Sequence, residues 1–164
     1  MNRLMFVLSG EHPTLPAAEA AAAIQAEHRA FKTVEQLDQV LIAETSASPE
    51  SLASRLAMCR GICFHLGTCG ATEEEMLEAV GSSDIVDLVP HGRTFAVHIK
   101  RIKRSAPGID TLELSKRIAE MVAHEVEFKV DLEYPEVELI GILTGDRCVF
   151  GVTATKVDRT QFTR

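Results

Sequence analysis

Short apolar runs, separated by alanine-rich or proline-containing segments, organise the first 70 residues of the chain. The segments after Thr14 and after Ser48 predict helices, because a capping hydroxyl is followed within two residues by proline. We expect the first helix to reach about residue 30 and the second to end near residue 60. The apolar runs predict buried strands at residues 3–8, 40–44 and 62–66. This part of the chain therefore predicts the order β-α-β-α-β.

The pattern continues in the second half with two capped helices and three strands. Thr72 and Glu75 form a capping box, which predicts a helix to about Val80. Asp110 is the expected cap of a longer helix, whose apolar side chains recur on one face. These side chains are Leu114, Ile118, Met121, Val122 and Val126. The expected strands cover residues 94–102, 137–143 and 148–152.

These elements predict an α+β fold of two consecutive units, each a small sheet covered by helices on one face. Tandem split-βαβ sheets of the ferredoxin-like kind fit this order of elements. We expect the first unit to cover residues 1–68 and the second unit to cover residues 69–156. Residues 157–164 are polar and are expected to begin a linker.

The composition is globular and narrows the classes of function. Hydrophobic residues make up 46% of the chain, which is enough to bury a core. Aromatic residues make up only 5%, with no tryptophan, which argues against single-strand binding through stacking platforms. No apolar segment reaches the roughly 18 residues that cross a membrane, and the apolar start is too short for a signal peptide. We therefore expect a cytoplasmic protein with no membrane partner.

The four cysteines lack the two tight ligand pairs of a typical zinc site. Cys59 and Cys63 are separated by three residues in a largely apolar stretch, and a metal site would have to add Cys69 and His65. Buried free thiols in a reducing compartment, without a metal, are the favoured interpretation. A stand-alone enzyme that uses Cys63, Cys69 and His65 remains an alternative.

The distribution of charge points to the second half as the part that contacts an anion. The formal net charge is −7, and residues 1–84 carry all of it, whereas residues 85–164 are neutral overall. A cluster of basic residues follows the strand that starts at residue 94. Because a phosphate backbone responds to local positive charge, its four cations are the leading candidate phosphate contacts. They are Lys100, Arg101, Lys103 and Arg104.

These four contacts would give single-stranded RNA a salt slope of roughly −3. A solvated strand end is the alternative interpretation of the cluster. Arg93, Lys116 and Arg117 are second-rank candidates. Lys116 and Arg117 could equally pair with glutamates one helical turn away, at positions 113 and 120.

Three segments of the second half resemble a THUMP domain: residues 95–101, 112–119 and 129–139. The most specific of them is Lys-Val-Asp-Leu-Glu-Tyr-Pro-Glu-Val at 129–137. Ala119 departs from the pattern, because many THUMP helices carry glycine there. In the first half, residues 8–19 are similar to the opening of the archaeal tRNA guanine-N2-methyltransferases. In that family a ferredoxin-like unit precedes THUMP and a methylase domain follows it.

The resemblance implies a region that docks the acceptor 3′ end of tRNA and positions it for the C-terminal catalytic domain of the same protein. We expect no catalytic residue, metal or cofactor in this segment, since it has neither a Gly-x-Gly-x-x-Gly sequence nor an Asn/Asp-Pro-Pro-aromatic motif. S-adenosylmethionine is expected in the methylase domain, which is absent here. Two alternatives stay open. One is the THUMP module of a thiouridine or pseudouridine synthase, and the other is a ferredoxin-like small-molecule-binding or assembly domain.

Overall fold

A computed structural model describes residues 1–27 and 30–157, so most of the predicted linker, residues 158–164, lies outside the described residues. The chain forms two compact units. The first comprises residues 1–65 and, among the described residues, also residues 153–157, and the second comprises residues 66–152. Within the described ranges, no helix has both the length and the apolar composition needed to cross a membrane.

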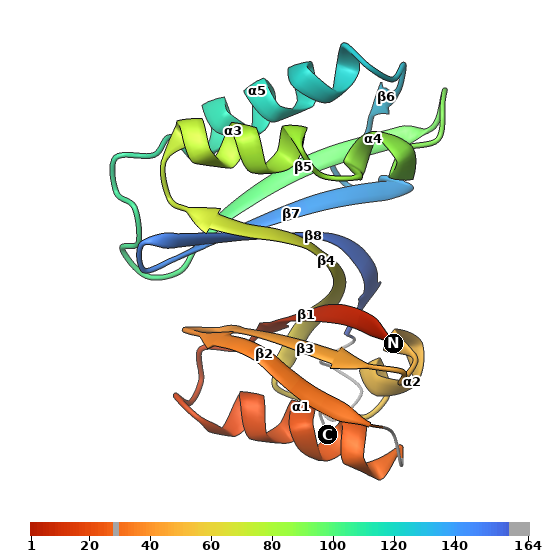
Figure 1. Cartoon of the computed structure of the whole chain (residues 1–164), viewed down its shortest axis with the longest axis vertical. Coiled ribbons are helices and arrows are strands. Elements are labelled where there is room, and N and C mark those ends of the chain that lie inside the picture. The colour runs from red at the N-terminus through yellow and green to blue at the C-terminus, as the bar shows by residue number, and fades with distance from the viewer. Residues whose placement is uncertain (28–29, 158–164) are drawn as a thin grey trace. The chain divides into compact units, whose positions relative to one another are not determined.

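The first unit contains a β-α-β-β-α-β series, which is the split-βαβ order expected of a ferredoxin-like fold. Its strands pair in the order β2-β3-β1-β4, and each of these pairs is antiparallel. In Figure 1, helix α1 lies against one face of this sheet. In chain order the elements are β1 (Asn2–Leu8), α1 (Leu15–Ala26), β2 (Phe31–Leu37), β3 (Val40–Thr45), α2 (Pro49–Ala53) and the first part of β4 (Cys59–Gly70).

Several sequence-based expectations for this unit were wrong. Thr14 precedes α1 but makes no side-chain cap hydrogen bond, and α1 ends at Ala26 rather than near residue 30. Strand β2 was missed, because its residues are largely exposed and it contains no apolar run: Val34 is 39% exposed, and β2 pairs only with β3 in the strand order. Helix α2 ends at Ala53 rather than near residue 60. The Glu19 carboxylate accepts the backbone N–H groups of Ala57 and Met58, and this links the segment after α2 to α1.

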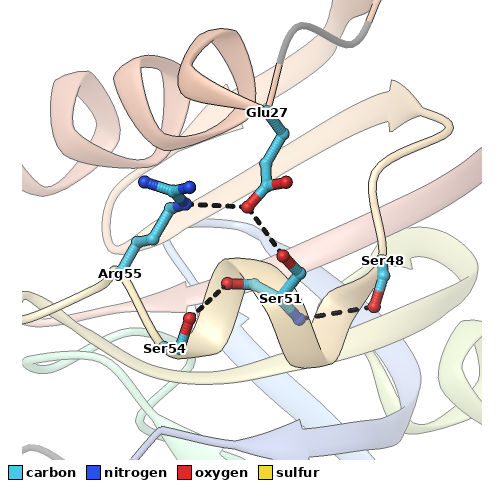
Figure 2. Close-up of polar contacts among 5 residues, drawn as sticks. All are labelled: Glu27, Ser48, Ser51, Ser54 and Arg55. Atoms are coloured by element: carbon cyan, nitrogen blue, oxygen red, sulfur yellow. Dashed lines mark hydrogen bonds and ion pairs between the residues drawn. The ribbon is translucent and has the colours of Figure 1, made fainter.

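Side-chain hydrogen bonds also hold the short helix α2 in place (Figure 2). The Ser48 hydroxyl accepts the N–H of Ser51 at 3.3 Å, as predicted for the helix cap. The Ser51 hydroxyl donates to Glu27 at 2.6 Å, and Arg55 donates to the same carboxylate at 2.7 Å. Glu27 follows α1, so these contacts connect the two helices of the first unit.

The second unit follows a different element order, with two helices before its first complete strand. Strand β5 lies between β7 and β6 and is parallel to both, whereas β7 and β8 are antiparallel. Helices α3 and α5 lie side by side over this sheet (Figure 1). After the end of β4, the elements are α3 (Glu73–Gly81), α4 (Ile85–Leu88), β5 (Thr94–Arg101), α5 (Thr111–Ala123), β6 (Lys129–Val130), β7 (Val137–Thr144) and β8 (Arg147–Lys156).

The predicted patterns of the second unit are confirmed in its core, which supports the α+β fold class. Phe95, Val97 and Ile99 alternate along β5 and are all buried in one cluster. The apolar face of α5 packs into the same cluster. Thr72 and Asp110 cap α3 and α5, accepting the N–H of the residue three positions later. Helix α4 was not predicted, because it is four residues long and has no side-chain cap.

Candidate nucleic-acid interface

The basic cluster forms an ordered turn at the C-terminal end of β5. We call residues 100–105 the basic turn. The buried Ile102 donates its N–H to the Leu143 carbonyl at 2.8 Å, continuing the pairing with β7. Ser105 closes the turn by donating its N–H to the Ile102 carbonyl at 3.1 Å. The side chains of Lys100, Lys103 and Arg104 are exposed.

A second set of hydrogen bonds connects the basic turn to the β7–β8 hairpin. The Ser105 hydroxyl donates to the Ile102 carbonyl at 2.7 Å and accepts the N–H of Gly145 at 2.8 Å. Lys103 has a φ of 54°, in the left-handed region that favours glycine.

Arg101 has a different role from the other three cations of the cluster. It is half-buried, and its guanidinium donates to the carbonyls of Ser105, Ala106 and Ile109. The bond to Ser105 measures 2.8 Å. The planar guanidinium suits several carbonyls at once, so Arg101 holds the loop that follows the turn. Arg101 was one of the four candidate phosphate contacts, and its guanidinium is already engaged by carbonyls of the same unit.

Replacing Arg101 should therefore lower stability. We expect Arg101→Met to reduce the free energy of unfolding by about 2 kcal/mol, because charge-assisted hydrogen bonds to half-buried carbonyls are lost. Arg104→Met is the matched control, since Arg104 is exposed, and should change stability by less than about 0.5 kcal/mol. Urea unfolding followed by circular dichroism compares the two variants. Equal effects would contradict the assignment of Arg101.

The structure does not bring the second-rank cations into the basic turn. Arg93 precedes β5, so roughly 25 Å of strand separates it from the turn, and it forms an ion pair with Glu136 at 3.2 Å. Arg117 pairs with Glu73 and, at 3.5 Å, with Glu113, as one alternative for it anticipated. Lys116 is exposed on α5, and within the described residues no acidic side chain lies within ion-pair distance of it.

An exposed apolar strip was missed by the sequence analysis. Val130, Leu132 and Tyr134 are 67%, 63% and 82% exposed, and they lie on the segment with the most specific resemblance. The Asp131 carboxylate accepts the N–H groups of residues 133 and 134 at 3.1 and 3.0 Å, so a defined turn presents the tyrosine. Beside the strip is an apolar groove of about 330 Å³ between α5 and the sheet.

The metal and stand-alone-enzyme interpretations of the cysteines gain no support from the geometry. Cys63, His65 and Cys69 lie two and four residues apart along β4. Because an extended strand advances about 3.3 Å per residue, β4 spreads these side chains out instead of bringing them together. Cys59 pairs with Leu8, and Cys63 with Met5, which places the two thiols on opposite faces of the strand. Within residues 1–27 and 30–157, no three metal-binding side chains gather into one group.

The structure thus defines a mixed α/β protein in which a split-βαβ unit is joined to a unit with a parallel strand pair. The chain belongs to the THUMP domain family, which matches residues 70–153. It is 28% identical over 148 residues to a tRNA (guanine(10)-N2)-dimethyltransferase of Methanothermobacter thermautotrophicus. That match covers 89% of this chain and 42% of the relative, so the chain spans less than half of the relative's length.

Solved structures share the fold of both units. TrmN from Thermus thermophilus matches with a TM-score of 0.65 at 16% identity, over 98% of this chain and 48% of that one. A 4-thiouridine synthetase crystallised as an RNA complex with bound ATP matches with a TM-score of 0.59 at 14% identity, over 93% and 41%. Identities this low show similarity of fold alone.

Proposed function

We propose that this chain is the RNA-docking region of a tRNA-modifying enzyme, and that it holds the acceptor 3′ end of tRNA. The observation that carries the proposal is the basic turn. Its exposed cations project from a backbone that β7, Ser105 and Arg101 hold in place. A preformed turn loses little conformational entropy when it binds phosphate, so little of the binding free energy supplied by its few positive charges is offset.

The family membership and the curated relative support a partner of this kind. The relative acts on tRNA, and we propose that this chain is the N-terminal region of a tRNA guanine-N2-methyltransferase. Its role would then be positioning: a docked acceptor end fixes the distance to a guanine that a C-terminal methylase domain reaches. We assign the S-adenosylmethionine site to that domain, because this chain contains no Gly-x-Gly-x-x-Gly sequence.

Filter binding with two tRNA transcripts, one complete and one lacking its unpaired 3′ nucleotides, tests the proposal. We expect weak binding of the complete tRNA, clearly reduced for the shortened one. Arg101 is half-buried and only three cations of the basic turn are exposed, so the salt slope should be about −2 rather than −3. Equal binding of both transcripts would refute docking of the 3′ end, and no RNA affinity would favour the small-molecule or assembly alternative.

The RNA-bound 4-thiouridine synthetase with this fold keeps a second enzyme class open. A thiouridine or pseudouridine synthase would use the same docking function with another catalytic domain. Purified full-length protein separates these classes: incubation with tRNA and S-adenosylmethionine should yield methylated guanosine, detected by mass spectrometry of nucleosides. If thiouridine or pseudouridine is produced instead, the docking proposal stands, but the full-length protein is a thiouridine or pseudouridine synthase and not a methyltransferase.

We also propose that Tyr134 stacks on an unpaired base. Tyr134→Ala should weaken RNA binding by about 1 kcal/mol, which is roughly five-fold. This value is at the lower end of the range for base–aromatic stacking, because the Tyr134 ring is highly exposed. Tyr134→Phe keeps the ring and should bind as the unchanged protein does. Since Tyr134 is the sole tyrosine and the chain lacks tryptophan, quenching of its emission by RNA measures stacking directly. Unchanged emission at saturating RNA would exclude the contact.

A further inference from the structure

Two cysteines of the second unit lie opposite each other on neighbouring strands. Ala71 donates its N–H to the carbonyl of Asp146 at 3.0 Å, and β4 is next to β8 in the strand order. Val157 donates its N–H to the Arg60 carbonyl at 3.3 Å, so residue numbers fall along β8 as they rise along β4, and the two strands are antiparallel. Two residues from the Ala71–Asp146 pair, Cys69 and Cys148 therefore form a cross-strand pair on one face. Both side chains pack into the core cluster of the second unit.

The two thiols are in unequal surroundings. Both are free, and each affects the pKa of the other. Cys148 is fully buried, whereas Cys69 is partly exposed. The partial exposure of Cys69 gives a small oxidant access to this residue from solvent, whereas burial shields Cys148.

The electrostatics favour Cys69 as the reactive thiol. The hydrogen bond from Cys148 lowers the pKa of the Cys69 thiol, and Arg147 acts in the same direction, although partial burial and Glu75 oppose them. The same bond, together with burial, raises the pKa of Cys148. Because the thiolate is the nucleophile, Cys69 reacts first and Cys148 keeps its proton.

We propose that Cys69 and Cys148 are an oxidative modification site, at which a hydroperoxide converts the two thiols into a cross-strand disulfide. The Cys69 thiolate attacks the O–O bond, takes one oxygen as a sulfenic acid, and the other leaves, after protonation, as water or an alcohol. The Cys148 sulfur then attacks Cys69, so that the S–S bond forms, the S–O bond breaks, and the proton of Cys148 leaves in water. Two electrons pass from the two sulfurs to the peroxide.

The strand geometry permits this bond. Directly opposed residues of an antiparallel pair have Cα atoms about 4.5 to 5.5 Å apart, which lies within the range of about 4.4 to 6.8 Å that a disulfide bridges. The remaining thiols offer no comparable pair. Cys59 and Cys63 are on opposite faces of β4, and burial raises the pKa of Cys59 to about 12, so it stays a thiol.

Oxidation of the whole chain with a small excess of hydrogen peroxide tests the proposal. We expect the thiols titrated in denaturant to fall from four to two, the intact mass to drop by two hydrogens, and a peptide linking Cys69 to Cys148 to appear. Dithiothreitol should restore all four thiols. The rate of loss should reach half its maximum below pH 9.0, the ordinary thiol pKa, because the thiolate of Cys69 forms earlier.

Two variants keep the test decisive. Cys148→Ala should form no disulfide and should accumulate a sulfenic acid at Cys69 that dimedone traps, whereas Cys63→Ala should still lose two thiols. Circular dichroism checks that each variant is folded. The proposal is overturned if four thiols survive peroxide, if the linked peptide contains Cys59 or Cys63, or if Cys69 becomes sulfinic acid without a link to Cys148.

Discussion

Reversing the charges of Lys103 and Arg104 is expected to weaken tRNA binding by roughly 50-fold at about 50 mM salt. Each phosphate contact with a single strand contributes about 0.7 to the exponent with which the binding constant depends on salt. At about 50 mM salt, the loss of two contacts therefore lowers the binding constant by roughly 50-fold. The salt slope should fall from about −2 to about −0.7, because Lys100 alone remains of the three exposed cations. Filter binding of Lys103→Glu/Arg104→Glu across a salt series measures both quantities.

A charge-matched control distinguishes the basic turn from net charge. Lys32→Glu/Arg60→Glu changes the net charge equally, but both positions are exposed residues of the first unit, whereas the basic turn belongs to the second unit. This control should bind tRNA within about three-fold of the unchanged protein, as expected when local charge dominates. If the two double variants bind tRNA with equal affinity, whether high or low, the basic turn is not the phosphate contact.

Truncating Phe95 is expected to have the largest effect on stability. Its side chain is fully buried in the core of the second unit and meets Phe128 edge to face, with ring centroids 4.9 Å apart. Phe95→Ala should lower the free energy of unfolding by about 3–5 kcal/mol, since a buried ring is replaced by a cavity and the aromatic contact is lost. Many domains have only about 5–15 kcal/mol in total, so the loss is readily measured by urea denaturation.

Phe64→Ala provides the control, because Phe64 is 40% exposed on β4. We expect a loss of less than about 1.5 kcal/mol there, since the removed ring leaves no enclosed cavity. Hydrogen exchange can locate the damage. In Phe95→Ala the amides of β5 and β7 should exchange faster, whereas equal losses for both variants would mean that Phe95 is not part of a tightly packed core.

Strong local signals explain which elements could be predicted. The alternation in β5 and the caps at Thr72 and Asp110 are encoded within a few residues, and each was confirmed. Strand β2 lacked such a signal, because its pairing with β3 rather than its own apolar residues makes it a strand. The segment after α2 is likewise held by Glu19, a residue far away in sequence.

The candidate interface likewise contains some features that are visible in the sequence and others that only the fold determines. The basic cluster was visible as a run of residues, and the family resemblance was carried by short motifs. The inward turn of Arg101 could not be predicted, because the carbonyls that bind it belong to a loop whose path the fold determines. Tyr134 was likewise hidden, since exposure of one tyrosine depends on the turn at Asp131 and on the packing of β6.

By itself, then, the sequence determined the elements with strong local patterns, the mixed α/β class, the family and the position of the positive charge. Tertiary structure alone decided which cations remain exposed, which aromatic ring faces solvent, and that Cys69 lies opposite Cys148. The physical reason is the range of the interactions involved. Caps and alternation act within a turn or a strand, whereas strand register and burial join residues about 80 positions apart and exist only once the chain has folded.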